Sequence, residues 1–448
     1  MPPIIPISQH FDQPTLGKLI DTDAVVQRYR TLFALFDWTA LEPAVKPSGP
    51  GRPSHPPSAY VKALLVRIGE HLGSTPRWRA YLLDHPLLVL ELGFRPHVDL
   101  RQPYGFEVAK TVPSVRHLNH MLQSLDPNLL TDLFTQSVQA LQAEIPGLGE
   151  VVAYDVKHIY ANVKENNPRV SMKDRYCKDR QPKGDPDCRV GVKRSTNQQQ
   201  PDGSTKEVKE YLWGYGSGVA AATTPDYGDV VIAEHTLPFN EADVTYYRPL
   251  YLRTVVTLDH FPIHVTADAA FDSWYVYETV AHREGIAAIP LNNHGHEEVP
   301  RDPDGTPRCT RGLRMYPTSQ FEHTNGFRAQ RFRCPLLFPT RTGEICAHEQ
   351  FVKGKGCVKD PNWEKGGFMR ALLDRSGPLY KAVYTQRTCC ERINSQAKDL
   401  GIERPKARNI RSIRRLNTLI YITINAKALQ RARAINASLL TSTRGLVA

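Results

Sequence analysis

The sequence is poor in the features that mark secreted and membrane proteins. It has only eight cysteines in 448 residues, too few for a scaffold held by disulfides. No stretch approaches the roughly 20 apolar residues that a membrane-spanning helix requires, and the apolar run at residues 419–424 is far too short. The first residues, MPPIIPISQHFDQ, lack the basic and apolar regions of a secretion signal. We therefore expect a cytoplasmic protein with reduced thiols and no membrane partner.

Several catalytic motifs are also absent from the sequence. It contains no G-x-S-x-G nucleophile turn, no G-x-x-x-x-G-K-[ST] phosphate loop and no H-E-x-x-H metal helix. Any chemistry that the chain performs must therefore come from a different set of residues.

Basic residues outnumber acidic ones. The chain has 57 Lys and Arg against 46 Asp and Glu, a formal net charge of +11, which favours a polyanionic partner. Its hydrophobic content of 41% and charged content of 23% are typical of a soluble globular protein. The length predicts two or three domains.

The residue pattern divides the chain into five segments. Residues 1–147 are predicted to form a helical N-terminal domain, because apolar residues recur at spacings of three and four. These helices suit a helix-turn-helix-like DNA-binding region and a plain helical bundle equally well. The remaining segments are an α/β part at 148–290 with a long polar loop at 166–207, a β-rich insertion at 291–375, a return to the α/β part at 376–415, and a C-terminal helix (416–429) and tail at 416–448.

Two aspartates stand in unusual places in the α/β part. Asp155 interrupts a β-branched and aromatic run, and a carboxylate on a central strand is unfavourable unless it is paired or binds a metal. Asp268 follows an apolar strand and precedes a helix, at the edge where active sites of α/β sheets gather. Asp272 is near enough to be an alternative, and we prefer Asp268 because it ends the strand directly.

Residues 376–401 are predicted to form one helix, with a proline in its first turn and a glycine just past its end. At about 100° per residue, Tyr384, Arg387, Glu391 and Lys398 lie within an arc of roughly 60°. A tyrosine and two cations suit contacts with successive phosphates, whereas a carboxylate does not. Binding a metal beside a phosphate would explain Glu391, and a solvated face with ordinary salt pairs is the alternative.

Three carboxylates thus stand in places that suit metal binding. Together, Asp155, Asp268 and Glu391 would hold two divalent cations about 4 Å apart across a scissile phosphate. Hard oxygen ligands and a phosphate substrate favour Mg²⁺ or Mn²⁺ over zinc.

At this point the sequence resembles a known family. The Y-x2-R-x3-E-x6-K spacing at residues 384–398 is similar to the Y-R-E-K signature of bacterial insertion-sequence transposases of the DDE type. The segment VVAYDVKH around Asp155 resembles the first aspartate motif of that family, and ADAAFDS around Asp268 resembles the second. The resemblance covers roughly residues 149–415.

The resemblance implies a fold and an activity. The fold would be α/β, with a ribonuclease-H-like mixed sheet, flanking helices and a β-rich insertion, after an all-α N-terminal domain. Asp155, Asp268 and Glu391 would be the catalytic residues and would bind two Mg²⁺ or Mn²⁺ ions. The enzyme would cleave double-stranded DNA at insertion-sequence ends and transfer the freed 3′-hydroxyl into target DNA. It would be a bacterial, nucleoid-associated protein that forms a homodimeric synaptic complex.

Six further residues are candidates for DNA contacts. The resemblance implies that three of them hold the DNA backbone near the cleaved end: Tyr384, Arg387 and Lys398. Three more lie on one face of a predicted helix, which suits phosphate contact as well as it suits a solvated basic face: Arg411, Arg414 and Arg415.

Two other functions stay open. A related metal-dependent nuclease would cut DNA without strand transfer. A DNA-binding regulator, or a domesticated and inactive transposase, would use the helical and basic regions alone.

The insertion contains Cys309, Cys334, Cys346 and Cys357. No C-x-x-C pair is present, and gaps of 24, 11 and 10 residues are unspecific for zinc. The sequence leaves zinc binding by this set open.

Overall fold

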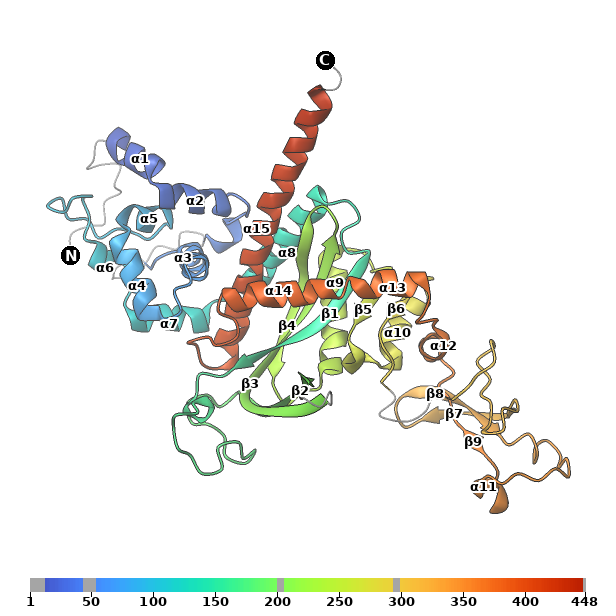
Figure 1. Cartoon of the computed structure of the whole chain (residues 1–448). Coiled ribbons are helices and arrows are strands. Elements are labelled where there is room, and N and C mark those ends of the chain that lie inside the picture. Colours follow the sequence, from blue (N-terminus) through green and yellow to red (C-terminus); the bar gives the residue numbers. More distant parts are fainter. Residues whose placement is uncertain (1–12, 43–53, 200–204, 293–298, 446–448) are drawn as a thin grey trace.

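The computed structural model describes residues 13–42, 54–199, 205–292 and 299–445, which form a mixed α/β architecture (Figure 1). The N-terminal part is helical, as predicted. Its helices are α1 (Gln13–Thr22), α2 (Ala24–Phe33), α3 (Pro57–Gly69), α4 (Thr75–Asp84), α5 (Pro86–Glu91), α6 (Val108–Thr111), α7 (Val115–Ser124) and α8 (Pro127–Glu144). Helix α3 is buried along most of its length, because nearly all of its residues are apolar or small.

A mixed sheet forms the centre of the molecule. Its strands are β1 (Val151–Tyr160), β2 (Arg189–Gln199), β3 (Thr205–Thr224), β4 (Gly228–Pro238), β5 (His264–Ala267) and β6 (Ala287–Ala288). The order is β2-β3-β1-β5-β6, with β4 also paired to β3. Strand β1 runs antiparallel to β3 and parallel to β5, so it lies at the change from antiparallel to parallel pairing.

Helices cover this sheet and connect its strands. Between β4 and β6 lie the 3-10 turn η4 (Asp243–Tyr246), helix α9 (Tyr247–Leu258), the 3-10 turn η5 (Ala269–Phe271) and helix α10 (Trp274–Ala281). After the small sheet of the insertion come α12 (Lys365–Leu372), α13 (Pro378–Thr385), α14 (Thr388–Asp399) and α15 (Ile410–Gly445). Figure 1 shows α13 and α14 crossing the sheet, and α15 extending away from it toward the C-terminus.

The last helix is longer than the sequence predicts. Helix α15 begins at Ile410 rather than at residue 416 and continues to Gly445, past the predicted end at 429. It packs against α8 and β4, and this tertiary contact supports helical turns that local apolar spacing does not mark.

A buried amide joins α15 to the outer edge of β4. The Asn425 Oδ1 accepts a hydrogen bond from Val231 N at 2.9 Å, and its Nδ2 donates to Val231 O at 2.8 Å. The same Nδ2 lies 3.1 Å from the Ser137 hydroxyl on α8. Because Asn425 is fully buried, these bonds replace those that water would otherwise make.

The polar loop predicted at 166–207 is shorter than expected. Strand β2 and the first residues of β3 lie within that range and pair with each other beyond the centre of the sheet. Their Lys, Arg and Gln composition hides the strand from an apolar pattern, because this hairpin is held by backbone hydrogen bonds. The intervening loop is anchored by Asp185, a buried residue whose carboxylate accepts a bond from the Tyr215 hydroxyl at 2.7 Å.

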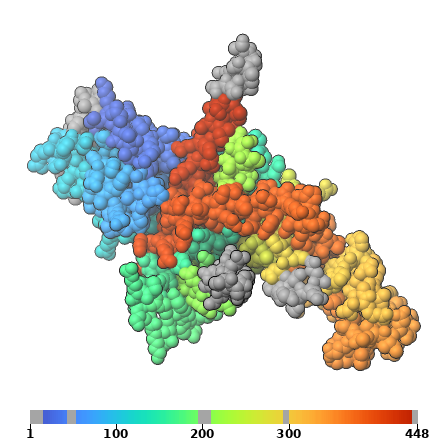
Figure 2. Space-filling view, in the orientation of Figure 1, coloured from blue at the N-terminus to red at the C-terminus, as the bar shows by residue number. Residues whose placement is uncertain are grey.

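The insertion contains a small sheet, as predicted. Strands β7 (Tyr316–His323), β8 (Phe327–Arg333) and β9 (Val358–Lys359) pair in that order. The short helix α11 (Glu349–Val352) lies between β8 and β9 along the chain, and α12 follows β9. In the space-filling view the insertion projects from the body of the molecule (Figure 2). The division of the chain into five domains stays a prediction.

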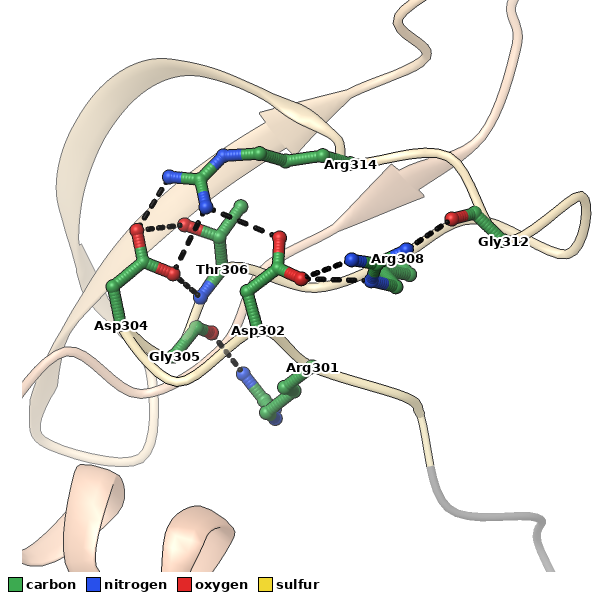
Figure 3. A network of polar contacts seen from close by, with 8 residues as sticks. All are labelled: Arg301, Asp302, Asp304, Gly305, Thr306, Arg308, Gly312 and Arg314. Carbon is green, nitrogen blue, oxygen red and sulfur yellow. Dashed lines mark hydrogen bonds and ion pairs between the residues drawn. The ribbon is translucent and has the colours of Figure 1, made fainter.

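An ion network fixes the first loop of the insertion (Figure 3). Asp302 is 7% exposed and accepts bonds from Arg308 Nε at 2.7 Å and from Arg314 Nη1 at 3.1 Å. Arg314 also pairs with Asp304, and these contacts, with the Thr306 backbone, lower the pKa of Asp304 to about 2. The network closes a loop that has little apolar surface of its own.

Among the described residues, no helix has both the length and the apolar character that crossing a membrane requires.

Candidate active site

The strand register brings the two predicted aspartates together. Tyr154 on β1 pairs with Ala267, the last residue of β5, so Asp155 on β1 and Asp268 just after β5 each follow a paired position of two neighbouring parallel strands. Such strands lie about 4.8 Å apart, and aligned residues point to the same face of the sheet. The Asp268 side chain also caps η5, because its Oδ1 accepts a bond from Ala270 N at 2.9 Å.

The alternative second aspartate is engaged elsewhere. The Asp272 side chain is fully buried and forms a two-pronged ion pair with Arg370, with Nε–Oδ1 at 2.8 Å and Nη2–Oδ2 at 2.5 Å. The Tyr277 hydroxyl donates a further bond to it at 2.8 Å. With both oxygens occupied, Asp272 holds α12 to the core, which supports the preference for Asp268.

The single helix predicted at 376–401 is instead two helices. Helices α13 and α14 are separated by a turn at Gln386 and Arg387, where Gln386 N bonds to Val383 O at 3.1 Å and Arg387 N to Tyr384 O at 3.0 Å. These bonds reach back three residues, so the turn is tighter than an α-helix. The arc calculated for a continuous helix therefore does not apply across this turn, although α14 keeps its own spacing.

Helix α14 carries Glu391 to the sheet. Three residues after Glu391, Asn394 donates a bond from Nδ2 to Asp155 Oδ2 at 2.8 Å, which ties α14 directly to β1. Residues three apart lie on the same side of a helix, so Glu391 faces the same region one turn earlier. Its carboxylate is 55% exposed and pairs with Arg387 Nη2 at 2.7 Å. Sequence reasoning missed Asn394, which lacks any motif of its own.

A fourth carboxylate, Asp243, was also missed. It opens η4, and this turn contacts both β1 and η5, the elements that position Asp155 and Asp268. No spacing pattern marks Asp243 in the sequence, because only the folded chain brings η4 to the sheet. Its acidic side chain was the only available signal.

The carboxylates at this site repel one another. Burial raises the pKa of Asp155 to about 6, and the nearby charges of Asp268 and Glu391 add to this effect. Burial likewise raises the pKa of Asp243 to about 7, with further contributions from Asp268 and Asp155. Such concentrated negative charge is unfavourable unless a cation or protons balance it.

The chemistry of these donors fits divalent metal ions. Carboxylate oxygens are hard ligands of the kind that Mg²⁺ and Mn²⁺ prefer, and a cation would relieve the repulsion among Asp155, Asp268 and Asp243. In residues 13–42, 54–199, 205–292 and 299–445, no three His, Cys, Asp or Glu side chains already stand close enough to hold a metal ion. Glu391 would have to turn from Arg387 to complete the predicted set.

Comparisons with known proteins add little to this geometry. No family model matches the chain, and no curated protein matches it. One solved structure, a cryo-EM structure of a piggyBac transposase synaptic complex with hairpin DNA, is similar at 12% sequence identity and a TM-score of 0.31. The similarity spans 98% of this chain and 82% of that chain. A TM-score of this size does not establish a common fold.

The residues predicted to contact DNA near the cut lie along α13 and α14. The Arg387 guanidinium lies over the Tyr384 ring, 5.7 Å from its centroid, beside Glu391. Lys398 is 61% exposed at the far end of α14 and lies 3.7 Å from a carboxylate oxygen of Glu403. Of these residues, Arg387 contacts a carboxylate of the site directly, and Tyr384 lies beside Arg387.

The three arginines of α15 do not share one exposed face. Arg411 is exposed, and Arg414 is exposed with its Nε bonded to Thr236 O at 3.1 Å. Arg415 is 8% exposed, and its Nε donates to Leu125 O at 2.6 Å. The predicted common face is therefore not an exposed one, because α15 buries Arg415 against the end of α7, and a contact of Arg415 with a DNA phosphate stays a prediction.

The insertion brings its four cysteines into one small core. Cys309, Cys334, Cys346 and Cys357 are buried free thiols that pack together with apolar side chains. Burial and the three neighbouring thiols raise the pKa of Cys357. The long gaps between these residues in the sequence gave no sign of this clustering, since the sheet of the insertion creates it.

Proposed function

We propose that the chain is a transposase of the DDE type with a ribonuclease-H-like core. The observation that carries this proposal is the register between β1 and β5, which sets Asp155 beside Asp268, together with the Asn394–Asp155 bond that docks the Glu391 helix on the same strand. The strands bring together residues that are 113 positions apart, in the order that the resemblance implies.

In this proposal Asp155, Asp268 and Glu391 hold two divalent cations. When bound, these ions supply an activated water and stabilise the leaving 3′-oxygen during phosphodiester cleavage. Asn394 keeps the Asp155 carboxylate oriented through its 2.8 Å bond. Arg387 and Tyr384 hold the DNA backbone, since a guanidinium binds phosphate through paired hydrogen bonds. The freed 3′-hydroxyl then attacks target DNA, so no covalent bond between protein and DNA is required. A homodimeric complex on the two ends stays a prediction.

A nicking assay tests this function. The substrate is a supercoiled plasmid that carries the gene for this chain with its flanking DNA, incubated with Mg²⁺ or with EDTA. We expect Mg²⁺-dependent cuts at fixed positions. Asp155→Asn, Asp268→Asn and Glu391→Gln should each lower the rate by more than the about 10- to 100-fold typical of losing a residue that supports a metal ligand.

Matched controls remove a carboxylate elsewhere. Asp226→Asn in the exposed β3–β4 turn and Glu322→Gln on the exposed face of β7 should cut as the parent does. If the three site variants cut as fast as these controls, the assignment of the site is wrong. Products joined to a second plasmid would distinguish a transposase from a nuclease, and tight DNA binding without any cutting would favour a regulator.

A further inference from the structure

Two adjoining cavities lie where the N-terminal helices meet the chain after α14. The first has a volume of about 450 Å³ and lies between α3, α4 and residues 399–406. The second, of about 360 Å³, lies between the end of β1 and residues 404–408. Both are lined by residues 404–406, so they share one wall. Figure 2 shows the blue N-terminal helices meeting the orange-red chain in this region.

The lining of these cavities is strongly cationic. Four cations line the first cavity and two more line the second, which makes six, against one carboxylate, Asp399, in both linings together. The six are Arg67, Arg77, Arg404, Lys406, Lys164 and Arg408. The nearby Glu403 is already balanced, because Lys157 and Lys398 lie 3.4 and 3.7 Å from its carboxylate. A concave surface with this charge suits a polyanion.

Arg67 distinguishes this surface from an ordinary solvated basic face. Arg67 is 4% exposed. Within the described residues its guanidinium donates to carbonyl oxygens, from Nε to Leu72 O at 3.2 Å and from Nη2 to Gly73 O at 3.4 Å, and it lies over the Trp78 ring, 5.6 Å from the centroid. Burial lowers the pKa of Arg67 to about 10. No carboxylate in the described part of the chain pairs with it. A buried cation without an anion is costly, so an anionic ligand in the adjoining cavity would stabilise it.

The two walls are held at a fixed separation. His71, just after α3, has its Nδ1 2.9 Å from Asp399 O at the end of α14. On the second cavity, the Arg404 guanidinium lies over the Tyr160 ring at 4.0 Å, and Arg408 Nε donates to Asn162 O at 3.2 Å. These contacts position the cations before any ligand arrives.

The distance to the carboxylates suggests which part of a DNA substrate lies here. Tyr160, which lines the second cavity, is five residues after Asp155 on β1. At about 3.3 Å per residue this is roughly 17 Å. One strand of duplex DNA carries a phosphate about every 3.4 Å along the axis. Because phosphates also wind around the axis, the straight-line distance between two of them exceeds their axial separation, so the second cavity lies within about five nucleotides of a phosphate held at Asp155.

We propose that the two cavities form one groove that binds the DNA backbone within about five nucleotides of the cleaved phosphate, with Arg77 on one wall and Arg404 and Lys406 on the other. The proposal rests on the proposed function, because it takes DNA as the ligand. It assigns DNA contacts both to the N-terminal helices and to the segment after α14.

The salt dependence of DNA binding tests the groove. Binding of a fluorescent 30-base-pair duplex is measured by anisotropy at several salt concentrations, with EDTA present so that cleavage does not interfere. Each phosphate contact contributes about 0.9 to the slope of log K against log salt. The double variant Arg404→Ala with Lys406→Ala should make the negative slope shallower by about 1.8, and Arg77→Ala alone should make it shallower by about 0.9.

The matched control is Lys18→Ala with Arg341→Ala, which removes the same charges from exposed positions outside both cavities. Its slope should equal that of the parent. The groove is refuted if the double variant behaves like this control, and its two-walled form is refuted if Arg77→Ala leaves the slope unchanged.

Failure of the groove can be told apart from failure of the proposed function. If the groove variants show a smaller slope than the parent but the parent never cuts DNA, the groove is supported and the transposase activity is refuted. A parent that cuts DNA while all variants keep its slope would support the activity and refute the groove.

Discussion

Replacing Asp243 with Asn should stabilise the protein, and the gain should grow with pH. Burial, Asp268 and Asp155 raise the pKa of Asp243 from 3.8 to about 7. Below pH 3.8 the carboxyl group is protonated in both the folded and the unfolded chain, so its charge costs nothing. As pH rises toward 7 the unfolded chain ionises first, and the fold loses stability until the folded carboxyl group has ionised as well.

The size of this effect follows from the two pKa values. Each pH unit between 3.8 and about 7 corresponds to about 1.4 kcal/mol, which gives about 4 kcal/mol above pH 7 as an upper limit. We expect Asp243→Asn to raise the free energy of unfolding by about 2–4 kcal/mol at pH 8, and by about 2 kcal/mol less at pH 5. The amide keeps the shape of the side chain but cannot ionise.

Urea unfolding in EDTA at pH 5 and pH 8, followed by circular dichroism, measures this difference. Asp226→Asn is the control, because it removes an exposed carboxylate and should change stability by less than about 0.5 kcal/mol at either pH. An equal gain at both pH values would refute the reasoning. If the proposed metal site is correct, Mg²⁺ should narrow the gap between parent and variant at pH 8, since the parent alone keeps the full negative charge.

Three further substitutions test individual contacts. Arg370→Ala should lower the free energy of unfolding by about 3–5 kcal/mol, because it leaves the buried Asp272 carboxylate without its cation; urea unfolding with Arg341→Ala as control measures this. Asn394→Ala should slow Mg²⁺-dependent nicking about 10- to 100-fold, because Asn394 holds the Asp155 carboxylate, while changing the free energy of unfolding by only about 1 kcal/mol. A variant that unfolds would contradict this prediction of a large effect on activity and a small effect on stability. Gly356→Ala should destabilise the insertion by at least about 1 kcal/mol, because Gly356 has a φ of +66° and an added Cβ would lie 2.6 Å from the Cys334 Cβ. Faster limited proteolysis of the insertion would show this loss of stability. Gly354→Ala is the comparison, because that position also has a positive φ but leaves room for a Cβ.

The elements that carry the two aspartates could be predicted from the sequence. An apolar run broken by Asp155 and another ended by Asp268 identify strands, and the structure confirms both strands and the helix after the second. These features depend on neighbours in sequence, so local patterns are sufficient to find them.

Contacts between distant segments could not be predicted in this way. Asn394 and Asp243 become neighbours of Asp155 only because α14 and η4 fold against β1, and no spacing in the sequence encodes that approach. The burial of Arg415 could not be predicted either. Its basic neighbours predict exposure, whereas the packing of α15 buries it.

The two hydrogen bonds between Asn425 and Val231 cover part of the unpaired edge of β4. Among the described strands, β4 pairs only with β3, so its other side would present free backbone donors and acceptors. Exposed strand edges of this kind are templates for the strands of another molecule. At Val231 the Asn425 amide offers the same donor and acceptor as an incoming strand would, and the body of α15 blocks the approach. One side chain thus helps to keep the protein from aggregating through its own sheet.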